Sequence, residues 1–226
     1  MIWRVLSTAL PAGVAAGLLV SLLQFATVRP LIEAAERIEQ GLPASAPAEA
    51  IAAVPDPGGA DRSANRAERQ RMLLTLGANV LLGVGFGLFL AGAYLIHGGR
   101  VGLLRGFLWG LGGFAVFQLA PALGLPPALP GSPLADVTAR QVWWVGTVVA
   151  SAVGLALVVF SRRNLLRGVG VVVILLPHLI GAPHLGPGVP SPLPPELILR
   201  FILVSLATTG MFWVFLGGLS GWLHSR

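Results

Sequence analysis

Residues 142 to 160 read VWWVGTVVASAVGLALVVF, a run of nineteen residues without one charged side chain. A helix of about 20 apolar residues spans the hydrocarbon core of a bilayer, which is about 30 Å thick. An uninterrupted apolar run of this length indicates a helix that crosses a membrane.

Five more segments resemble this one, in a chain of 226 residues that is 55% hydrophobic and 11% charged. The mean hydropathy of +0.81 lies far outside the range of soluble domains. The predicted spans are residues 3–28, 72–96, 103–123, 142–160, 165–180 and 197–219. The sequence predicts an all-α polytopic membrane protein, a single membrane domain of residues 1–226 with six transmembrane helices.

The charged residues indicate the orientation. With six spans, both termini lie on one side, together with seven arginines and no acidic residue: Arg4, Arg100, Arg105, Arg162, Arg163, Arg167 and Arg226. All nine acidic residues fall on the other side. Short loops rich in arginine stay in the cytoplasm, so we expect cytoplasmic N- and C-termini.

Residues 29–71 form the long first loop, which this orientation places outside the cytoplasm. It begins with RPLIEAAERIEQGLP, where Leu31, Ile32, Ala35 and Ile38 share one helical face. This pattern predicts a short amphipathic helix packed on lipid headgroups or on the bundle, with Glu33 and Arg37 as an ion pair four residues apart. Residues 41–59 are rich in Pro and Ala and lack a period, which predicts a disordered linker.

Glycines and polar residues interrupt the apolar spans. Gly13 and Gly17, like Gly217 and Gly221, are four apart, a spacing that lets helix backbones approach closely. Gln24 and Asn79 lie inside predicted spans. Each is expected to bond a neighbouring helix or to line a transport pathway.

A faint repeat links two segments that open with Arg-Gly at Arg105 and Arg167 and reach a proline sixteen residues later, at Pro121 and Pro183. Each is followed by a Pro-rich outer loop and a re-entering span. This spacing predicts parallel repeats of helical hairpins, a construction found in transporters.

Two histidines mark the outer end of the fifth span, where residues 175–184 read LLPHLIGAPH. Pro121 and Pro177 are expected to break or kink their helices there, beside Gln118 and His178. A turn that folds back at residues 181–183 would bring His178 and His184 into one cavity.

Carboxylates on the same outer face, Asp136 and Glu196, are candidates to complete this cavity. Imidazole and carboxylate without thiolate suit divalent Co, Ni, Zn or Mn. The alternative is structural: His178 bonds a loop carbonyl, His184 is solvated and Glu196 begins the sixth helix. Trp143 and Trp144 are expected to be interfacial anchors.

Several function classes are excluded. The chain has no cysteine and no lysine, so thiolate chemistry and the Walker A lysine are absent. It also lacks HExxH, an Asp-rich pair and a serine nucleophile motif, which leaves a lipid-modifying membrane enzyme as the weakest alternative. We expect no enzyme, no permanently bound cofactor, and no nucleotide or nucleic-acid partner.

The chain resembles the CbtA family of proposed bacterial cobalt transporter subunits. The resemblance rests on RPLIEAAERIE, GFLWGLGGFAVFQLAPALGLPPALPG, ARQVWWVGT, LLPHLIGAPH and SLATTGMFWVFLGGLSGWL. Glu36 and Glu39 match a glutamate pair typical after the first span, and Gln118, His178 and His184 match the family blocks. The resemblance implies cobalt uptake across the inner membrane, linked to cobalamin synthesis, with a small histidine-bearing membrane partner, CbtB.

Two hypotheses follow. In the first, an outer site of His178, His184, Asp136, Glu196, Glu36, Glu39 and Gln118 captures a divalent transition metal, with cobalt expected. The ion then crosses past Asn79 and Gln24. In the second, the chain is a membrane scaffold that binds partner helices and transports nothing.

Overall fold

The computed structural model describes residues 2–41, 60–98, 100–185 and 191–226. Within these ranges the chain is helical and contains no strand. Its helices are α1 (Ile2–Leu23), η1 (Gln24–Val28), α2 (Arg29–Glu39), α3 (Ala60–His97), α4 (Leu103–Phe114), η3 (Ala115–Leu119), α5 (Ala120–Gly124), α6 (Val137–Phe160), α7 (Asn164–Ile180) and α8 (Pro195–His224). The predicted linker of residues 41–59 lies outside the described residues, apart from Gly41.

Five helical rods in the described part of the chain are long and apolar enough to cross a membrane. They are Val5–Glu39, Asn65–His97, Leu103–Gly124, Val137–Phe160 and Pro195–His224. The fifth predicted span corresponds to α7, which has 17 residues and is about 26 Å long at 1.5 Å per residue. The all-α class is thus confirmed for the described residues, and the five long apolar rods agree with a polytopic membrane protein. A crossing by α7 stays a prediction.

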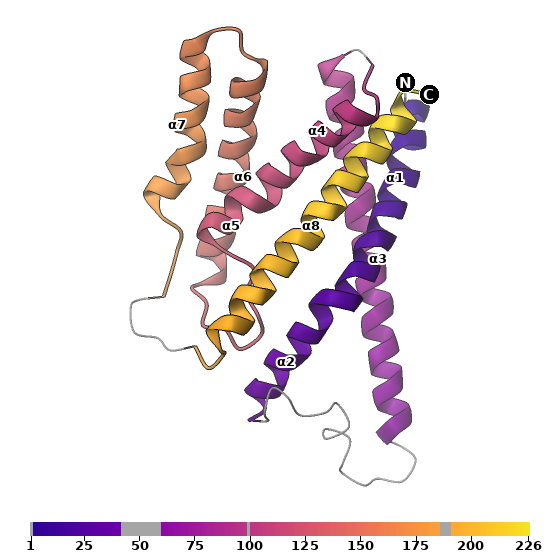
Figure 1. Cartoon of the computed structure of the whole chain (residues 1–226), viewed down its shortest axis with the longest axis vertical. Coiled ribbons are helices and arrows are strands. Elements are labelled where there is room, and N and C mark those ends of the chain that lie inside the picture. The colour runs from indigo at the N-terminus through magenta and orange to yellow at the C-terminus, as the bar shows by residue number, and fades with distance from the viewer. Residues whose placement is uncertain (1, 42–59, 99, 186–190) are drawn as a thin grey trace.

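Both termini lie at the same end of the molecule (Figure 1), which we call the terminal end. The last turns of α3 and α6 lie there too. The opposite end, which we call the loop end, holds α2 and the first turns of α3, α6 and α8 (Figure 1). The arginines at the chain ends and the acidic residues of α2 therefore lie at opposite ends of the bundle.

Glycines let pairs of helices approach closely. A Cβ atom added at Gly13 of α1 would lie 2.5 Å from the carbonyl oxygen of Gly83 in α3. One added at Gly106 of α4 would collide with the carbonyl oxygen of Gly217 in α8. Because only glycine fits at such contacts, the predicted tight packing of glycine faces is confirmed.

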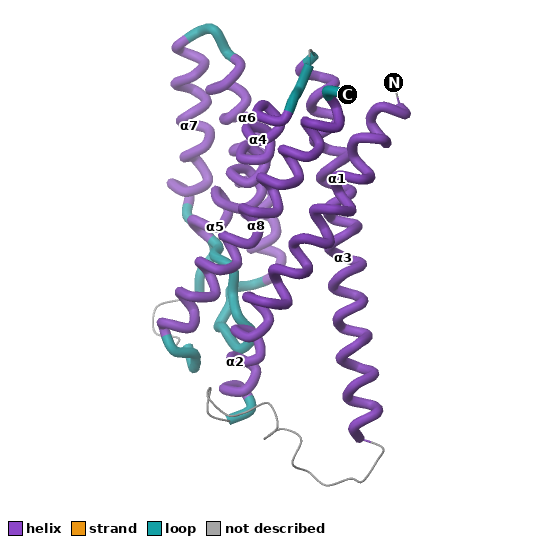
Figure 2. The backbone as a smooth tube through the Cα atoms, turned by 45° about the vertical axis from the view of Figure 1, so that its right-hand side comes forward, coloured by secondary structure: helices purple, strands orange, loops and turns teal. Residues whose placement is uncertain are grey.

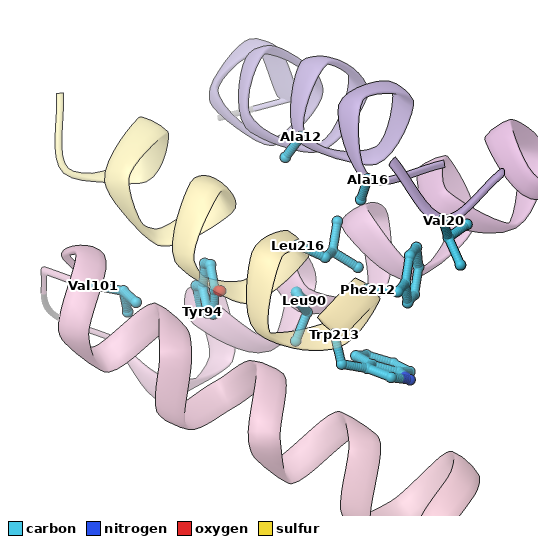
Figure 3. Packing of buried hydrophobic residues seen from close by; sticks show 9 residues of the cluster. All are labelled: Ala12, Ala16, Val20, Leu90, Tyr94, Val101, Phe212, Trp213 and Leu216. Atoms are coloured by element: carbon cyan, nitrogen blue, oxygen red, sulfur yellow. The ribbon is translucent and has the colours of Figure 1, made fainter. Parts of the chain in front are cut away.

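The core between α1, α3, α4 and α8 is built around Trp213, which is 1% exposed. Figure 3 shows Trp213 with Leu90 and Leu216 among these helices. The ring of Phe117 stacks on the Trp213 indole, with 5.5 Å between ring centres and 10° between their planes. Since Phe117 belongs to η3, this stacking holds the π-helical segment against α8.

The two π-helical segments each end two residues before a proline, Pro30 or Pro121. Proline has no N–H group, and its ring clashes with the carbonyl four residues earlier. In η3 the amide of Ala120 bonds the carbonyl of Ala115, five residues back, which displaces the crowded carbonyl from the proline. Of the predicted break or kink, the structure shows no break, because the rod continues past Pro121 to Gly124 and Pro177 lies inside α7. A kink at either proline stays a prediction.

The predicted hairpin repeat is not reflected in the packing. α4 packs mainly against α8, and α7 against α6. Pro121 lies within a helical rod, whereas Pro183 lies beyond the end of α7. The segments that begin at Arg105 and Arg167 thus differ after their first turns, and the repeat stays a prediction.

α6 and α7 form a hairpin beside the other helices (Figures 1 and 2). Their glycines make it tight, because a Cβ atom at Gly154 would lie 2.6 Å from the carbonyl oxygen of Gly170. The hairpin contacts the other helices chiefly through η3 and α5. Toward the terminal end an apolar cleft of about 360 Å³ separates α6 from α3 and α4. The hairpin is thus held mainly near the loop end.

A second apolar cluster closes the loop end. Leu31 and Ala35 of α2 pack with Leu129, Leu193 and Phe201. Of the two predicted surfaces for the amphipathic helix, α2 therefore covers the bundle. It follows η1 directly, so α2 continues the rod that starts with α1.

Candidate functional site

Trp143 joins three helices at the loop end. Its indole Nε1 donates a hydrogen bond to the carbonyl oxygen of Pro177 at 3.2 Å. A Cβ atom at Gly124, the last residue of α5, would collide with the Trp143 ring. Trp143 thus packs between α5 and α7, and its role as an interfacial anchor stays a prediction.

His178 lies against the same indole. Its ring centre is 5.8 Å from that of Trp143, and the two planes meet at 71°, an edge-to-face contact. The His178 Nε2 atom is buried and has no hydrogen-bond partner among the described residues. Buried polar atoms in native proteins nearly always bond protein, water or an ion. The nitrogen is thus available to bind a hydrogen-bond donor or a metal cation.

His184 takes a different position. α7 ends at Ile180, and Gly181 has φ of 90°, a left-handed conformation that starts the turn. Beyond this turn the His184 side chain is exposed. Nothing in the described residues brings His178 and His184 into a shared cavity, so their joint ligation stays a prediction.

The two predicted carboxylates of the outer loops begin helices. Asp136 is the N-cap of α6, and its Oδ1 accepts a hydrogen bond from the Ala139 amide at 2.9 Å. Glu196 is exposed in the first turn of α8, after Pro194 and Pro195. Both positions stabilise helix N-termini. For Glu196 this agrees with the structural alternative.

The family glutamates lie on α2. Glu36 is partly buried, and Glu39 is exposed, with its side-chain atoms beside Gly131 in the loop between α5 and α6. Across all described residues, no three His, Cys, Asp or Glu side chains lie close enough together to hold a metal ion. The predicted ligands therefore share one end of the molecule without forming a preassembled metal centre.

Arg29 binds the neighbouring acids. Its Nε donates to Glu33 at 2.6 Å, and its Nη2 donates to Glu68 of α3. The predicted pair between Glu33 and Arg37 is therefore wrong: Arg29 lies one turn before Glu33, at the same spacing on the helix, and it also reaches Glu68. This bridge ties the start of α2 to α3.

Gln118 lines a separate hollow of about 720 Å³ at the loop end. Pro121, Arg140, Gln141 and Trp144 line it as well, between the α5 segment and the first turns of α6. The hollow contains neither histidine of the predicted site. The sequence reasoning did not select Arg140, although its place at the start of a span after a Pro-rich loop was visible.

Asn79 and Gln24 meet inside the bundle. Asn79 Nδ2 donates hydrogen bonds to Gln24 Oε1 at 2.7 Å and to Ser21 Oγ at 3.0 Å. Ser21 in turn donates to the carbonyl oxygen of Gly17. This cluster joins α3 to the α1 rod, as the first alternative predicted. The sequence reasoning missed Ser21, which lies three residues before Gln24 on the same helical face.

The geometry thus places several carboxylates, and one imidazole whose Nε2 has no hydrogen-bond partner among the described residues, at one end of a membrane-type bundle. The family model CbtA, described as "Probable cobalt transporter subunit (CbtA)", matches residues 2–225. No curated protein and no solved structure matches the chain. The family match includes every helix and site residue described above, and it agrees with the resemblance found in the sequence. The chain therefore belongs to the CbtA family of probable cobalt transporter subunits.

Proposed function

We propose that this protein is a multi-pass inner-membrane subunit for uptake of a divalent transition metal, cobalt in particular, and that His178 binds the ion at the loop end. Family membership supports the transport of cobalt. The observation that carries the ligand assignment is the buried His178 Nε2 atom, which has no hydrogen-bond partner among the described residues.

The proposed orientation places the terminal end in the cytoplasm. Arg100 and Arg162 follow the ends of α3 and α6 there, and Arg167 lies in the first turn of α7. Arginine-rich short loops stay on the cytoplasmic side of bacterial membranes. α7 then crosses as the fifth of six spans, and its C-terminal His178 meets ions arriving from outside.

The acidic residues of the loop end serve capture in this proposal. Glu36 and Glu39 on α2, with Asp136 and Glu196 at the starts of α6 and α8, raise the local concentration of cations. His184, exposed beyond α7, binds the ion before it reaches His178. A single imidazole ligand with a buried Nε2 suits a transported ion, because conduction requires binding that is weak enough to release the ion.

A partner subunit supplies the remaining ligands. Borderline divalent metals are held by several nitrogen or oxygen donors, and the described residues contain no group of three. A small histidine-bearing membrane protein of the CbtB type would add imidazoles beside His178. Asn79 and Gln24 would then lie along the inward path, where their mutual hydrogen bond has to open.

The membrane potential is sufficient to drive such uptake. Moving one charge across 100 mV yields about 2.3 kcal/mol, so a divalent ion gains about 4.6 kcal/mol. At 1.4 kcal/mol per tenfold change this corresponds to about three orders of magnitude in concentration. An electrogenic path therefore needs no nucleotide hydrolysis.

The test is uptake of radiolabelled cobalt into vesicles that contain the full chain and its membrane partner, with an imposed inside-negative potential. We expect His178→Gln to lower the initial rate at least tenfold, and His184→Gln to lower it less. His97→Gln, a change at the terminal end, is the matched control and should stay within twofold of the unchanged protein.

Equal uptake by the unchanged protein and by the double variant His178→Gln/His184→Gln would refute the ligand assignment. A purified protein that binds no divalent metal by calorimetry, yet copurifies with its membrane partner, would favour the scaffold hypothesis instead.

A further inference from the structure

The hollow beside α5 differs in chemistry from the His178 region. It has a volume of about 720 Å³, within the range of pockets that bind small organic molecules. Its polar lining side chains are Gln118, Arg140 and Gln141, and its apolar wall includes Trp144. Among the described residues that line it, Arg140 alone carries a charge.

Arg140 has no acidic partner in the part of the chain that the structure describes. Its Nε atom is buried without a hydrogen bond, and it forms no ion pair with any described residue. The nearest acid in sequence, Asp136, directs its Oδ1 to the Ala139 amide as the cap of α6. The guanidinium therefore lies in the wall of the hollow, and no acid of the described residues compensates its positive charge.

A positive wall excludes a bare metal ion as the occupant. A divalent cation would be repelled by Arg140, and no carboxylate lines the hollow to offset that repulsion. An anion would instead be attracted by Arg140. Guanidinium N–H groups bind carboxylate and phosphate oxygens with charge-assisted hydrogen bonds, and the amide nitrogens of the two glutamines are further donors.

We propose that this hollow is a binding site for an anionic oxygen group, a carboxylate or a phosphate, held by Arg140 with Gln118 and Gln141. The group belongs either to a small soluble organic acid or to the headgroup of an anionic lipid. The site goes beyond the proposed metal uptake, since its ligand has the opposite charge and it uses neither histidine.

The experiment uses the full chain in nanodiscs of phosphatidylcholine, with citrate and inorganic phosphate as probes in calorimetry. A parallel arm uses nanodiscs that contain phosphatidylglycerol, with the retained lipid counted by native mass spectrometry. The variants are Arg140→Gln, which removes the charge, and Arg140→Lys, which keeps the charge and removes the planar fork. Arg200→Gln, an exposed arginine of α8 outside the hollow, is the matched control.

We expect Arg140→Gln to weaken binding at least tenfold, Arg140→Lys to weaken it about threefold, and Arg200→Gln to leave it unchanged. Loss of citrate or phosphate binding assigns the site to a soluble anion, and loss of retained phosphatidylglycerol alone assigns it to a lipid headgroup. Unchanged melting temperatures of the variants show that the fold persists. The proposal fails if the unchanged protein binds none of the three probes, or if Arg140→Gln and Arg200→Gln have equal effects.

Discussion

Trp143 and Trp144 are neighbours on α6 but lie in opposite chemical environments. Trp143 packs against His178, whose Nε2 lacks a partner. Trp144 is 40% exposed and lines the hollow with Arg140. Successive residues of an α-helix point about 100° apart, so Trp143 contacts the imidazole whose nitrogen suits a cation, while Trp144 lines the hollow whose guanidinium suits an anion. The comparison shows that the loop end contains two regions of opposite character, which a single outer-face site cannot describe.

Separating α6 from α7 should have the largest effect on this contrast. Gly154→Leu places a side chain where the Gly170 carbonyl lies, and we expect a loss of about 3 kcal/mol or more in unfolding free energy. Metal binding should fall at least tenfold because His178 leaves Trp143, while citrate binding at Arg140 stays within about threefold.

Denaturant unfolding in detergent and calorimetry measure both quantities for Gly154→Leu. Gly146→Leu is the control, since a Cβ atom there meets nothing within 4 Å. Parallel losses in the two variants would mean that the hairpin contact is not what positions His178.

A carboxylate introduced into the hollow should lower the affinity of the hollow for anions and leave metal binding at His178 unchanged. Gln118→Glu is expected to weaken citrate binding about tenfold, because the new charge pairs with Arg140. Cobalt binding should change less than twofold, and Gln118→Leu separates the loss of the amide from the added charge. If Gln118→Glu instead strengthens cobalt binding at least fivefold, Gln118 belongs to the metal site and the two regions are one.

The indole N–H of Trp143 should matter more than that of Trp144. Trp143→Phe removes the donor to the Pro177 carbonyl, with an expected cost of about 1 kcal/mol in unfolding free energy. Trp144→Phe should cost less than about 0.5 kcal/mol, as is usual for partly exposed positions. Chemical unfolding of both variants gives the comparison, and equal costs would contradict the assigned roles.

The smallest effect is expected at Asp136. Asp136→Asn keeps a capping oxygen and should change the unfolding free energy by only a few tenths of a kcal/mol, whereas Asp136→Ala should cost about 1 kcal/mol. Cobalt uptake by the Asn variant distinguishes a cap from a capture residue. If the Asp136→Asn variant takes up cobalt as fast as the unchanged protein, Asp136 has only its structural role as a cap.

The helical spans were predictable because long apolar runs have one low-energy form in a bilayer, where each backbone group must bond within its own segment. The glycine contacts were predictable in kind, because four-residue spacing creates a smooth helical face. The helix that packs against each glycine face was not predictable. Nothing in the local sequence around Gly106 indicates that it meets Gly217 instead of a glycine from α6 or α7.

The candidate sites were harder to predict for the same reason. His178 was identified as a residue of interest because an imidazole beside a proline in an apolar run is unusual. Arg140 was passed over because arginines at membrane borders are common, and only the folded structure reveals that its Nε is buried without a partner. Glu33 had candidate partners four residues before and after it, and the additional contact of Arg29 with Glu68 depends on where α3 passes.

The bridge from Arg29 to Glu33 and Glu68 has a practical consequence for labelling this protein. It joins Arg29 and Glu68, which lie on either side of residues 42–59, so an epitope inserted in that segment would lengthen a connection between two helices that are already tied together. Doubling the length of a flexible connection costs only about 0.6 kcal/mol. A fluorophore or antibody tag at this point would report sidedness while leaving both regions of the loop end untouched.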